Sequence, residues 1–125
     1  MRALQNFGIG VDIVDIDRFN ELKSKNLFLD KVFTKSEKEY CLSKNNPEVH
    51  LAARFSGKEA VLKALYSVGI KEVDYRKIEI LTDENGVPIV NLKDNIVDNI
   101  QIKVSLSHSR DESIAFAFVT VWDQP

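Results

Sequence analysis

The N-terminal segment of the chain alternates between apolar residues and small or polar ones from Phe7 to Val14. Because successive strand residues point to opposite faces, one face carries only apolar side chains: Phe7, Ile9, Val11 and Ile13. The other face carries Gly8, Gly10 and Asp12, and glycine inside a strand marks a place where another backbone or a ligand comes close. We therefore expect the apolar face to build the core and the glycine face to leave space beside Asp12, which is either a cap or a ligand.

Helical patterns follow this strand. Asp15 or Asp17 can cap one helix, and residues 34–37 (Thr-Lys-Ser-Glu) have the spacing of a capping box that opens another. The longest predicted helix begins at Asn46-Pro47, an N-cap followed by proline at the first helical position, and ends at Gly69. It carries an apolar stripe (Leu51, Phe55, Leu62 and Leu65) and small residues that let another segment approach closely (Ala52, Ala53, Ser56, Gly57, Ala60 and Ala64).

The second half of the chain has the pattern of four strands: 78–81, 89–92, 102–107 and 113–122. Asn85-Gly86 between the first two is a strong hairpin signal. A short helical or loop segment is expected at about 93–99. The last strand is apolar on both faces, which implies burial on both sides, by helices or by a neighbouring subunit. The pattern predicts an α+β fold, a small antiparallel sheet packed with a long helix and shorter ones.

Composition narrows the class of protein. A chain of 125 residues is long enough for one domain, expected to span 1–125, and its net charge of −2 offers no general attraction to nucleic acid. The single Cys41 excludes an internal disulfide and is expected to pack inertly. No run approaches the ~18 apolar residues of a membrane span. No signal peptide is expected before the first strand, so we expect a cytoplasmic protein.

Several charged residues on the long helix invite a chemical interpretation. Glu59 and Lys63 are four residues apart and could be no more than a solvated ion pair. A small-residue face with one carboxylate and several cations, however, also suits a polyphosphate held with Mg²⁺, which takes one or two protein carboxylates. Asp12 and Glu59 could be that pair if the first strand docks on the helix. Arg54, Lys58 and Lys63 would then neutralise phosphate charge.

The two histidines differ in their settings. His108 ends a strand just before a turn, where a structural role and a phosphate contact are both possible, whereas His50 is expected at the surface. The Gly8-x-Gly10 pair lacks the third glycine of a dinucleotide fingerprint, and the sequence contains no P-loop, no HExxH and no nucleophile elbow.

Three ordered segments resemble the holo-acyl-carrier-protein synthases, the small class of 4′-phosphopantetheinyl transferases: GIGVDIVDIDRF at 8–19, RFSGKEAVLKAL at 54–65 and VSLSHS at 104–109. The resemblance implies Mg²⁺-dependent transfer of phosphopantetheine from coenzyme A to a serine of apo acyl carrier protein, with adenosine 3′,5′-bisphosphate as the other product. It also implies a homotrimer with active sites at subunit interfaces. The alternative is a non-catalytic oligomeric domain that binds a nucleotide or a carrier.

The same resemblance assigns roles to residues. It implies that Asp12 and Glu59 are the Mg²⁺ ligands and that Lys63 lies near the pyrophosphate. These three residues and His108 would be the catalytic residues. The base that accepts the serine proton is left open between a metal-bound water, Asp12, Glu59 and His108, with a water relayed by a carboxylate preferred. Coenzyme A would contact Lys63 and His108 and, in addition, Arg54, Lys58, Asn85, Gly86 and Pro88.

The expected carrier-binding surface follows the first strand. Arg18 matches the family's arginine at this place, and Leu22 and Lys25 complete the predicted contact. Such a local basic patch would steer an acidic partner in spite of the negative net charge. Apolar residues at 27–29 stand where some relatives carry basic ones, so docking here is expected to depend more on apolar contact.

Overall fold

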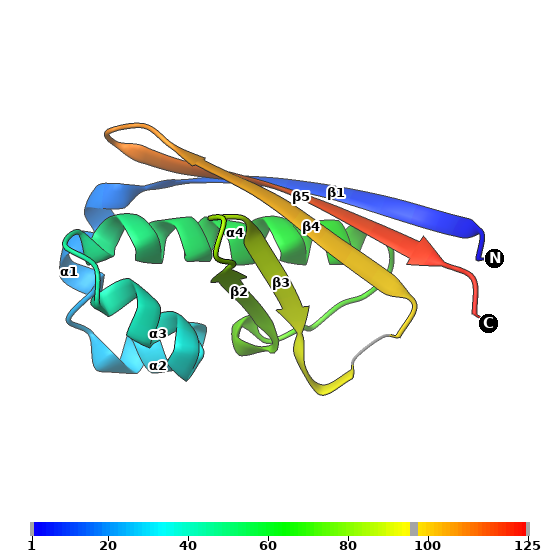
Figure 1. Cartoon of the computed structure of the whole chain (residues 1–125), viewed down its shortest axis with the longest axis horizontal. Helices are drawn as coiled ribbons and strands as arrows, with labels where there is room; N and C mark the ends of the chain where they lie inside the picture. The colour runs from blue at the N-terminus through cyan, green and yellow to red at the C-terminus, as the bar shows by residue number, and fades with distance from the viewer. Residues whose placement is uncertain (1, 96–97, 125) are drawn as a thin grey trace.

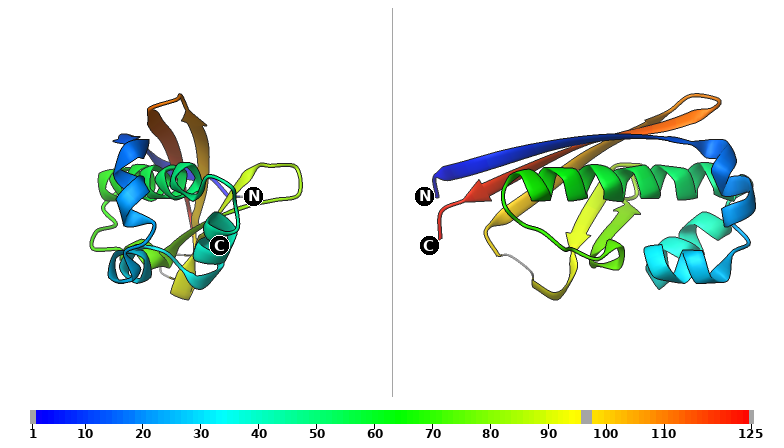
Figure 2. Two further views of the ribbon diagram at one scale, coloured as in Figure 1. Left: turned by 90° about the vertical axis from the view of Figure 1, so that its left-hand side faces the viewer. Right: turned by 180° about the vertical axis from the view of Figure 1, so that it is seen from behind.

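A computed structural model describes residues 2–95 and 98–124 of the chain. The long helix α4 lies in the middle, with a three-stranded sheet on one side and three short helices and a β-hairpin on the other (Figures 1 and 2). The helices of the chain are α1 (Phe19–Leu22), α2 (Asn26–Val32), α3 (Lys35–Leu42) and α4 (Pro47–Ser67), with 3₁₀ turns η1 (Ile16–Arg18), η2 (Tyr75–Lys77) and η3 (Lys93–Asn95). Its strands are β1 (Leu4–Asp15), β2 (Ile78–Thr82), β3 (Pro88–Leu92), β4 (Ile100–His108) and β5 (Glu112–Trp122). The predicted α+β class is confirmed.

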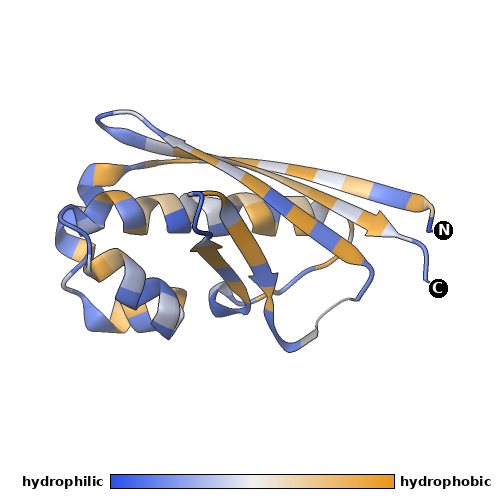
Figure 3. Ribbon diagram, in the orientation of Figure 1, coloured by the Kyte–Doolittle hydropathy of each residue, from blue (hydrophilic) through white to orange (hydrophobic). Residues whose placement is uncertain are grey.

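Both sheets are antiparallel, the larger in the order β1-β5-β4 and the smaller formed by β2 and β3. Apolar and polar residues alternate along β4, as the colours of Figure 3 show. In β5 the face toward α4 carries small side chains, among them Ser113, Ala115 and Ala117, all at most 1% exposed. These small residues let the sheet approach the helix closely.

The packing of β1 corrects one prediction. Its glycine face lies directly on α4: a Cβ atom added to Gly10 would come within 1.9 Å of the Ala60 carbonyl oxygen, and one added to Gly8 within 2.4 Å of that of Ala64. The face expected to build the core is the outer surface instead, with Phe7 56% and Ile13 57% exposed. Only glycine allows a strand backbone to contact a helix backbone so closely, so the larger side chains point away.

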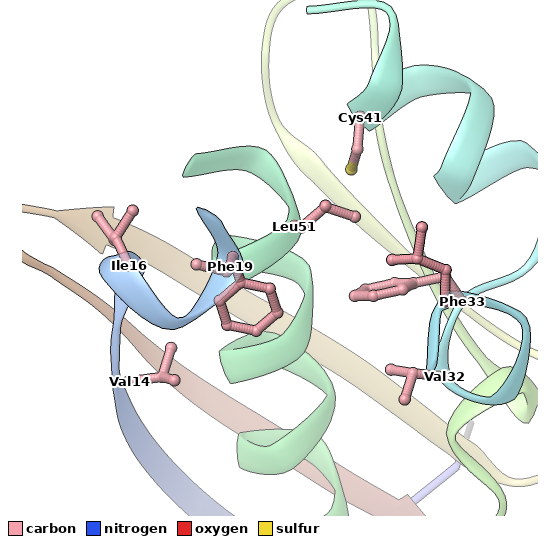
Figure 4. Packing of buried hydrophobic residues seen from close by; sticks show 9 residues of the cluster. Val14, Ile16, Phe19, Val32, Phe33, Cys41 and Leu51 are labelled. Atoms are coloured by element: carbon pink, nitrogen blue, oxygen red, sulfur yellow. The ribbon is translucent and has the colours of Figure 1, made fainter. Parts of the chain in front are cut away.

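The core has two parts, one near each end of α4. In the first, Phe19 of α1, Phe33 after α2 and Leu51 of α4 point into the space between these helices (Figure 4). Cys41 belongs to this cluster and is fully buried, which raises the pKa of its thiol to about 12 and keeps it neutral. The second part joins α4 to the sheet and to β2.

Local signals were confirmed unevenly. The capping box at Thr34 and Glu37 is formed, and α4 has Pro47 in its first turn, although the Asn46 side chain makes no capping hydrogen bond. Gly69, just beyond α4, has a φ of 89°. The helix predicted after β1 is instead η1 and α1 in succession, and α2 was not predicted. The segment expected at 93–99 begins with η3, and its residues 96 and 97 lie outside the described residues. Among the described residues, no helix is long and apolar enough to cross a membrane.

Candidate functional site

The docking of β1 on α4 brings one group of predicted residues together. Lys63 Nζ donates to Asp12 Oδ1 at 3.2 Å and to the Val11 carbonyl at 2.9 Å. The Asp12 side chain is only 16% exposed, whereas that of Lys63 is 54% exposed and reaches solvent. Four residues before Lys63 on the same helix, Glu59 accepts a hydrogen bond from the Tyr75 hydroxyl. We call Asp12, Glu59, Lys63 and Tyr75 the carboxylate group.

Tyr75 was missed by sequence reasoning. It lies in η2, sixteen residues after Glu59, and no motif links the two positions. Both carboxylates act on its hydroxyl. Burial, the hydrogen bond to Glu59 and the charges of Glu59 and Asp12 together raise the pKa of Tyr75 to about 12. The phenol therefore stays a neutral donor at physiological pH.

The carboxylate group suits a divalent cation of the hard type. Asp12 and Glu59 offer oxygen ligands, and Mg²⁺ characteristically takes one or two carboxylates and completes its octahedron with phosphate oxygens and water. No cluster of three or more His, Cys, Asp or Glu side chains that could hold a metal ion occurs among the described residues. Two protein carboxylates fit a cation whose other ligands are water and, once a phosphate substrate is bound, phosphate oxygens.

A second group of predicted residues lines a cavity of about 370 Å³ between α4, the β2–β3 turn and β4. Arg54, Gly86, Pro88 and His108 all contribute to its wall. Arg54 is 4% exposed, donates to Thr82 Oγ1, and its Nε has no hydrogen-bond partner in the described part of the chain. A buried guanidinium with a spare donor is suited to an anion such as phosphate.

The cavity is electropositive. His50, expected at the surface, is part of its wall together with Tyr40, whose ring lies 4.4 Å from the Arg54 guanidinium carbon. Burial, and then the positive charges of Arg54, Lys44 and His108, lower the pKa of His50. An anionic ligand in this cavity would oppose that change and raise the pKa of His50 again.

The two groups are separate within one chain. No residue of the carboxylate group lines the cavity. Arg54 and Glu59 are five residues apart on α4, so they point about 140° apart around the helix axis at 3.6 residues per turn. The sequence prediction put all these residues in one site, and the fold of a single chain divides them between two faces of a helix.

Two predicted coenzyme contacts, Lys58 and Asn85, belong neither to the carboxylate group nor to the cavity wall. Lys58 is fully buried, pairs with the Glu37 carboxylate at 2.8 Å, and donates to the carbonyls of Tyr75 (2.8 Å) and Ile78. Burial lowers its pKa, while Glu37 opposes that change. This corrects its expected role, because all three ammonium protons are occupied inside the fold. Asn85 lies in the exposed turn and is not part of the cavity wall.

The predicted carrier surface has mixed charge. Arg18 is exposed, with its guanidinium carbon 5.9 Å from the Phe55 ring centre, and Asp17 and Glu21 share a shallow cleft with it. Lys25 is exposed, and Leu22 is half-buried against the first core cluster. The patch is therefore less basic than the sequence suggested.

Comparisons with known proteins identify the relatives of this chain. The family model described as "4′-phosphopantetheinyl transferase superfamily" matches residues 8–119. A holo-[acyl-carrier-protein] synthase of Protochlamydia amoebophila is 42% identical over 92% of this chain and 96% of its own length, and one of Clostridium kluyveri is 41% identical over 92% and 90%.

Solved structures give the same result. A Chronobacterium ammoniagenes ACPS–CoA complex superposes with a TM-score of 0.78 at 25% identity, covering 96% of this chain and all of that one. A holo-(acyl-carrier-protein) synthase from Bacillus anthracis, in complex with CoA (3′,5′-ADP), gives 0.77 at 26% identity, with 95% and 99% covered.

Proposed function

The chain belongs to the 4′-phosphopantetheinyl transferase superfamily, and we propose that it transfers the 4′-phosphopantetheine group of coenzyme A to a serine of apo acyl carrier protein. The products are the holo carrier and adenosine 3′,5′-bisphosphate. Relatives at about 40% identity bear the name of this activity, and similar folds have been solved with coenzyme A. The observation that carries the proposal is the convergence of Asp12, Glu59 and Lys63, from two separate sequence motifs, at one place on this fold.

The chemistry asks the enzyme mainly for positioning and charge neutralisation. The nucleophile is the carrier's serine hydroxyl, which attacks the pantetheine-bearing phosphorus of the pyrophosphate and displaces adenosine 3′,5′-bisphosphate. Asp12 and Glu59 would hold Mg²⁺, which when bound neutralises pyrophosphate charge. Lys63 can turn its exposed ammonium from Asp12 to the pyrophosphate and stabilise the leaving group. A water relayed by one of the carboxylates accepts the serine proton.

The cavity is our proposed site for the nucleotide part of coenzyme A. Arg54, held by Thr82 and the Tyr40 ring, faces it together with His108, and the N–H groups of both side chains suit the nucleotide's phosphates. Gly86 and Pro88 form the turn that would contact the adenine. In this proposal the exposed His108 binds a phosphate and is also a candidate catalytic residue. Asn85 directly precedes Gly86 in the turn.

We propose a homotrimer whose active sites lie between subunits. The support is the outer face of β1 and β5, where large apolar side chains are 37–57% exposed: Phe7, Ile9, Val11, Ile13, Ile114, Phe116 and Phe118. A patch of this kind marks an interaction surface. Copies packed there would cover the second face of β5 and could set the cavity of one subunit against the carboxylate group of the next, which a single chain keeps apart.

The remaining proposals concern the setting of the activity. We propose that Arg18, Leu22 and Lys25 contact the carrier protein, and that the chain acts as one domain in the cytoplasm, where the Cys41 thiol stays reduced. Sedimentation of the purified chain tests the trimer directly, since a monomer at micromolar concentration would contradict it.

The activity is tested by incubating the chain with coenzyme A, Mg²⁺ and an apo acyl carrier protein. Mass spectrometry should detect a carrier heavier by one phosphopantetheine group, and Glu59→Gln, which keeps the helix and removes the charge, should form far less of it. Failure to modify any of several apo carriers would favour the non-catalytic binding domain instead.

A further inference from the structure

The Tyr75 hydroxyl makes the one hydrogen bond that the Glu59 carboxylate receives from the described residues. Its O–H donates to Oε1, and a carboxylate oxygen that accepts one hydrogen bond keeps a second lone pair for a metal ion. Glu59 otherwise projects from a half-exposed position on α4, where a glutamate side chain is free to change rotamer. The hydrogen bond therefore selects one orientation of this carboxylate.

The tyrosine is itself firmly held. Its ring stacks on that of Phe55, with centroids 5.8 Å apart and an angle of 30° between the planes. Its carbonyl oxygen accepts a hydrogen bond from Lys58 Nζ at 2.8 Å. The η2 turn that contains it is capped by Asp74, which accepts from the Arg76 amide at 3.0 Å. The ring, the backbone and the turn are each fixed by a different contact.

The lysine that holds this carbonyl is anchored in the core. Lys58 is 0% exposed and is paired with Glu37, whose second carboxylate oxygen accepts the Ile80 amide at 2.8 Å. Lys58 and Glu59 are consecutive on α4. One of them binds the backbone of Tyr75, and the other receives its hydroxyl. A buried ion pair with no access to solvent thus determines where the tyrosine lies relative to the helix.

We propose that Tyr75 is a positioning residue for Glu59, and that its hydroxyl orients the carboxylate for the divalent cation. This inference rests on the proposed function, from which the metal role of Glu59 comes. Side chains that hydrogen-bond to a metal ligand orient it, and their loss typically weakens metal binding by about 10- to 100-fold. On this account the Lys58–Glu37 pair contributes to the site indirectly, through Tyr75.

The test is Tyr75→Phe, which keeps the ring stacked on Phe55 and removes only the hydroxyl. Mn²⁺ alone, as a calorimetric probe of the cation site in the full chain, should bind about 10-fold more weakly to this variant than to the wild type. The matched control is Tyr66→Phe, at a tyrosine on α4 that is 62% exposed and belongs to neither group of site residues. It should bind Mn²⁺ as the wild type does.

A kinetic readout separates orientation from a general loss of structure. In the transfer assay, Tyr75→Phe should need about 10-fold more Mg²⁺ for half-maximal rate. Its rate should largely return at saturating Mg²⁺, because binding of the cation and not the chemical step is weakened. Thermal unfolding of both tyrosine variants checks that the fold is retained.

The outcomes distinguish this inference from the function on which it rests. Unchanged Mn²⁺ affinity in Tyr75→Phe, with binding abolished by Glu59→Gln, would overturn the positioning role and leave the transferase proposal intact. Tighter binding in Tyr75→Phe would also overturn it, because the hydroxyl would then compete with the cation. Mn²⁺ binding that does not depend on Glu59 would refute the metal site, and the inference with it.

Discussion

Two lysines on α4, five residues apart, have opposite surroundings. Lys58 is completely buried, and its three ammonium protons all donate to groups inside the fold. Lys63 is 54% exposed and contacts both Asp12 and the solvent. Both were predicted to bind phosphate, because sequence alone presents them as equivalent cations on one helix. The difference shows that one charge of α4 maintains the structure around the site, and the other is available for its chemistry.

The largest expected effect is the loss of the buried charge. Lys58→Met should lower the free energy of unfolding by about 3–5 kcal/mol, because it leaves the Glu37 carboxylate buried without a counter-charge. Denaturation by urea measures this value, and the exposed counterpart Lys63→Met should cost at most about 1 kcal/mol. Equal losses in the two variants would remove the distinction between the lysines.

The second effect is on catalysis. Lys63→Met should lower kcat by roughly 100-fold, about 2.7 kcal/mol of transition-state stabilisation, since it removes the cation that we propose binds the pyrophosphate. The measurement is the rate of carrier modification at saturating coenzyme A and Mg²⁺, with Lys71→Met, at another exposed lysine, as the control. A rate near that of the wild type would show that Lys63 is only a partner of Asp12.

A third prediction concerns Cys41 of α3, which is buried against α4 near the charges of Arg54, Glu37 and Lys58. Burial raises the pKa of this thiol from 9.0 to about 12. The folded chain therefore keeps a proton that the unfolded chain loses, so stability falls as pH rises between these values. The slope attributable to Cys41 approaches about 1.4 kcal/mol per pH unit.

Comparing the pH dependence of unfolding in the wild type and in Cys41→Ala isolates that slope. Identical slopes above pH 9.0 would mean that the thiol ionises as freely in the folded chain as in the unfolded one.

The smallest expected effect is that of salt on what each lysine contributes to the free energy of unfolding. The exposed Lys63–Asp12 pair contributes at most about 1 kcal/mol, and 1 M salt, with a Debye length of about 3 Å, should remove most of it. The cost of Lys58→Met should change little, because its ion pair is shielded from the solvent. Unfolding measured at low and high ionic strength makes this comparison, and a salt-sensitive Lys58 effect would contradict its burial.

Much of the site could be predicted from the sequence because the motifs that indicate it are local. The capping box at Thr34, the hairpin turn at Gly86 and the two motifs around Asp12 and Glu59 each depend on residues a few positions apart. Tyr75 could not be predicted in this way. Its role depends on a contact between η2 and α4, which no periodicity or spacing in either segment indicates.

The sequence by itself determined which residues of β1 share a face, since alternation is a property of the extended backbone. Only the tertiary structure decided which face is covered. Gly8 and Gly10 allow the strand to lie on the backbone of α4 at Ala60 and Ala64, and this close fit turns the larger apolar side chains outward. The same docking brings Asp12 to Lys63, and it leaves large apolar side chains exposed on the outer face of the sheet.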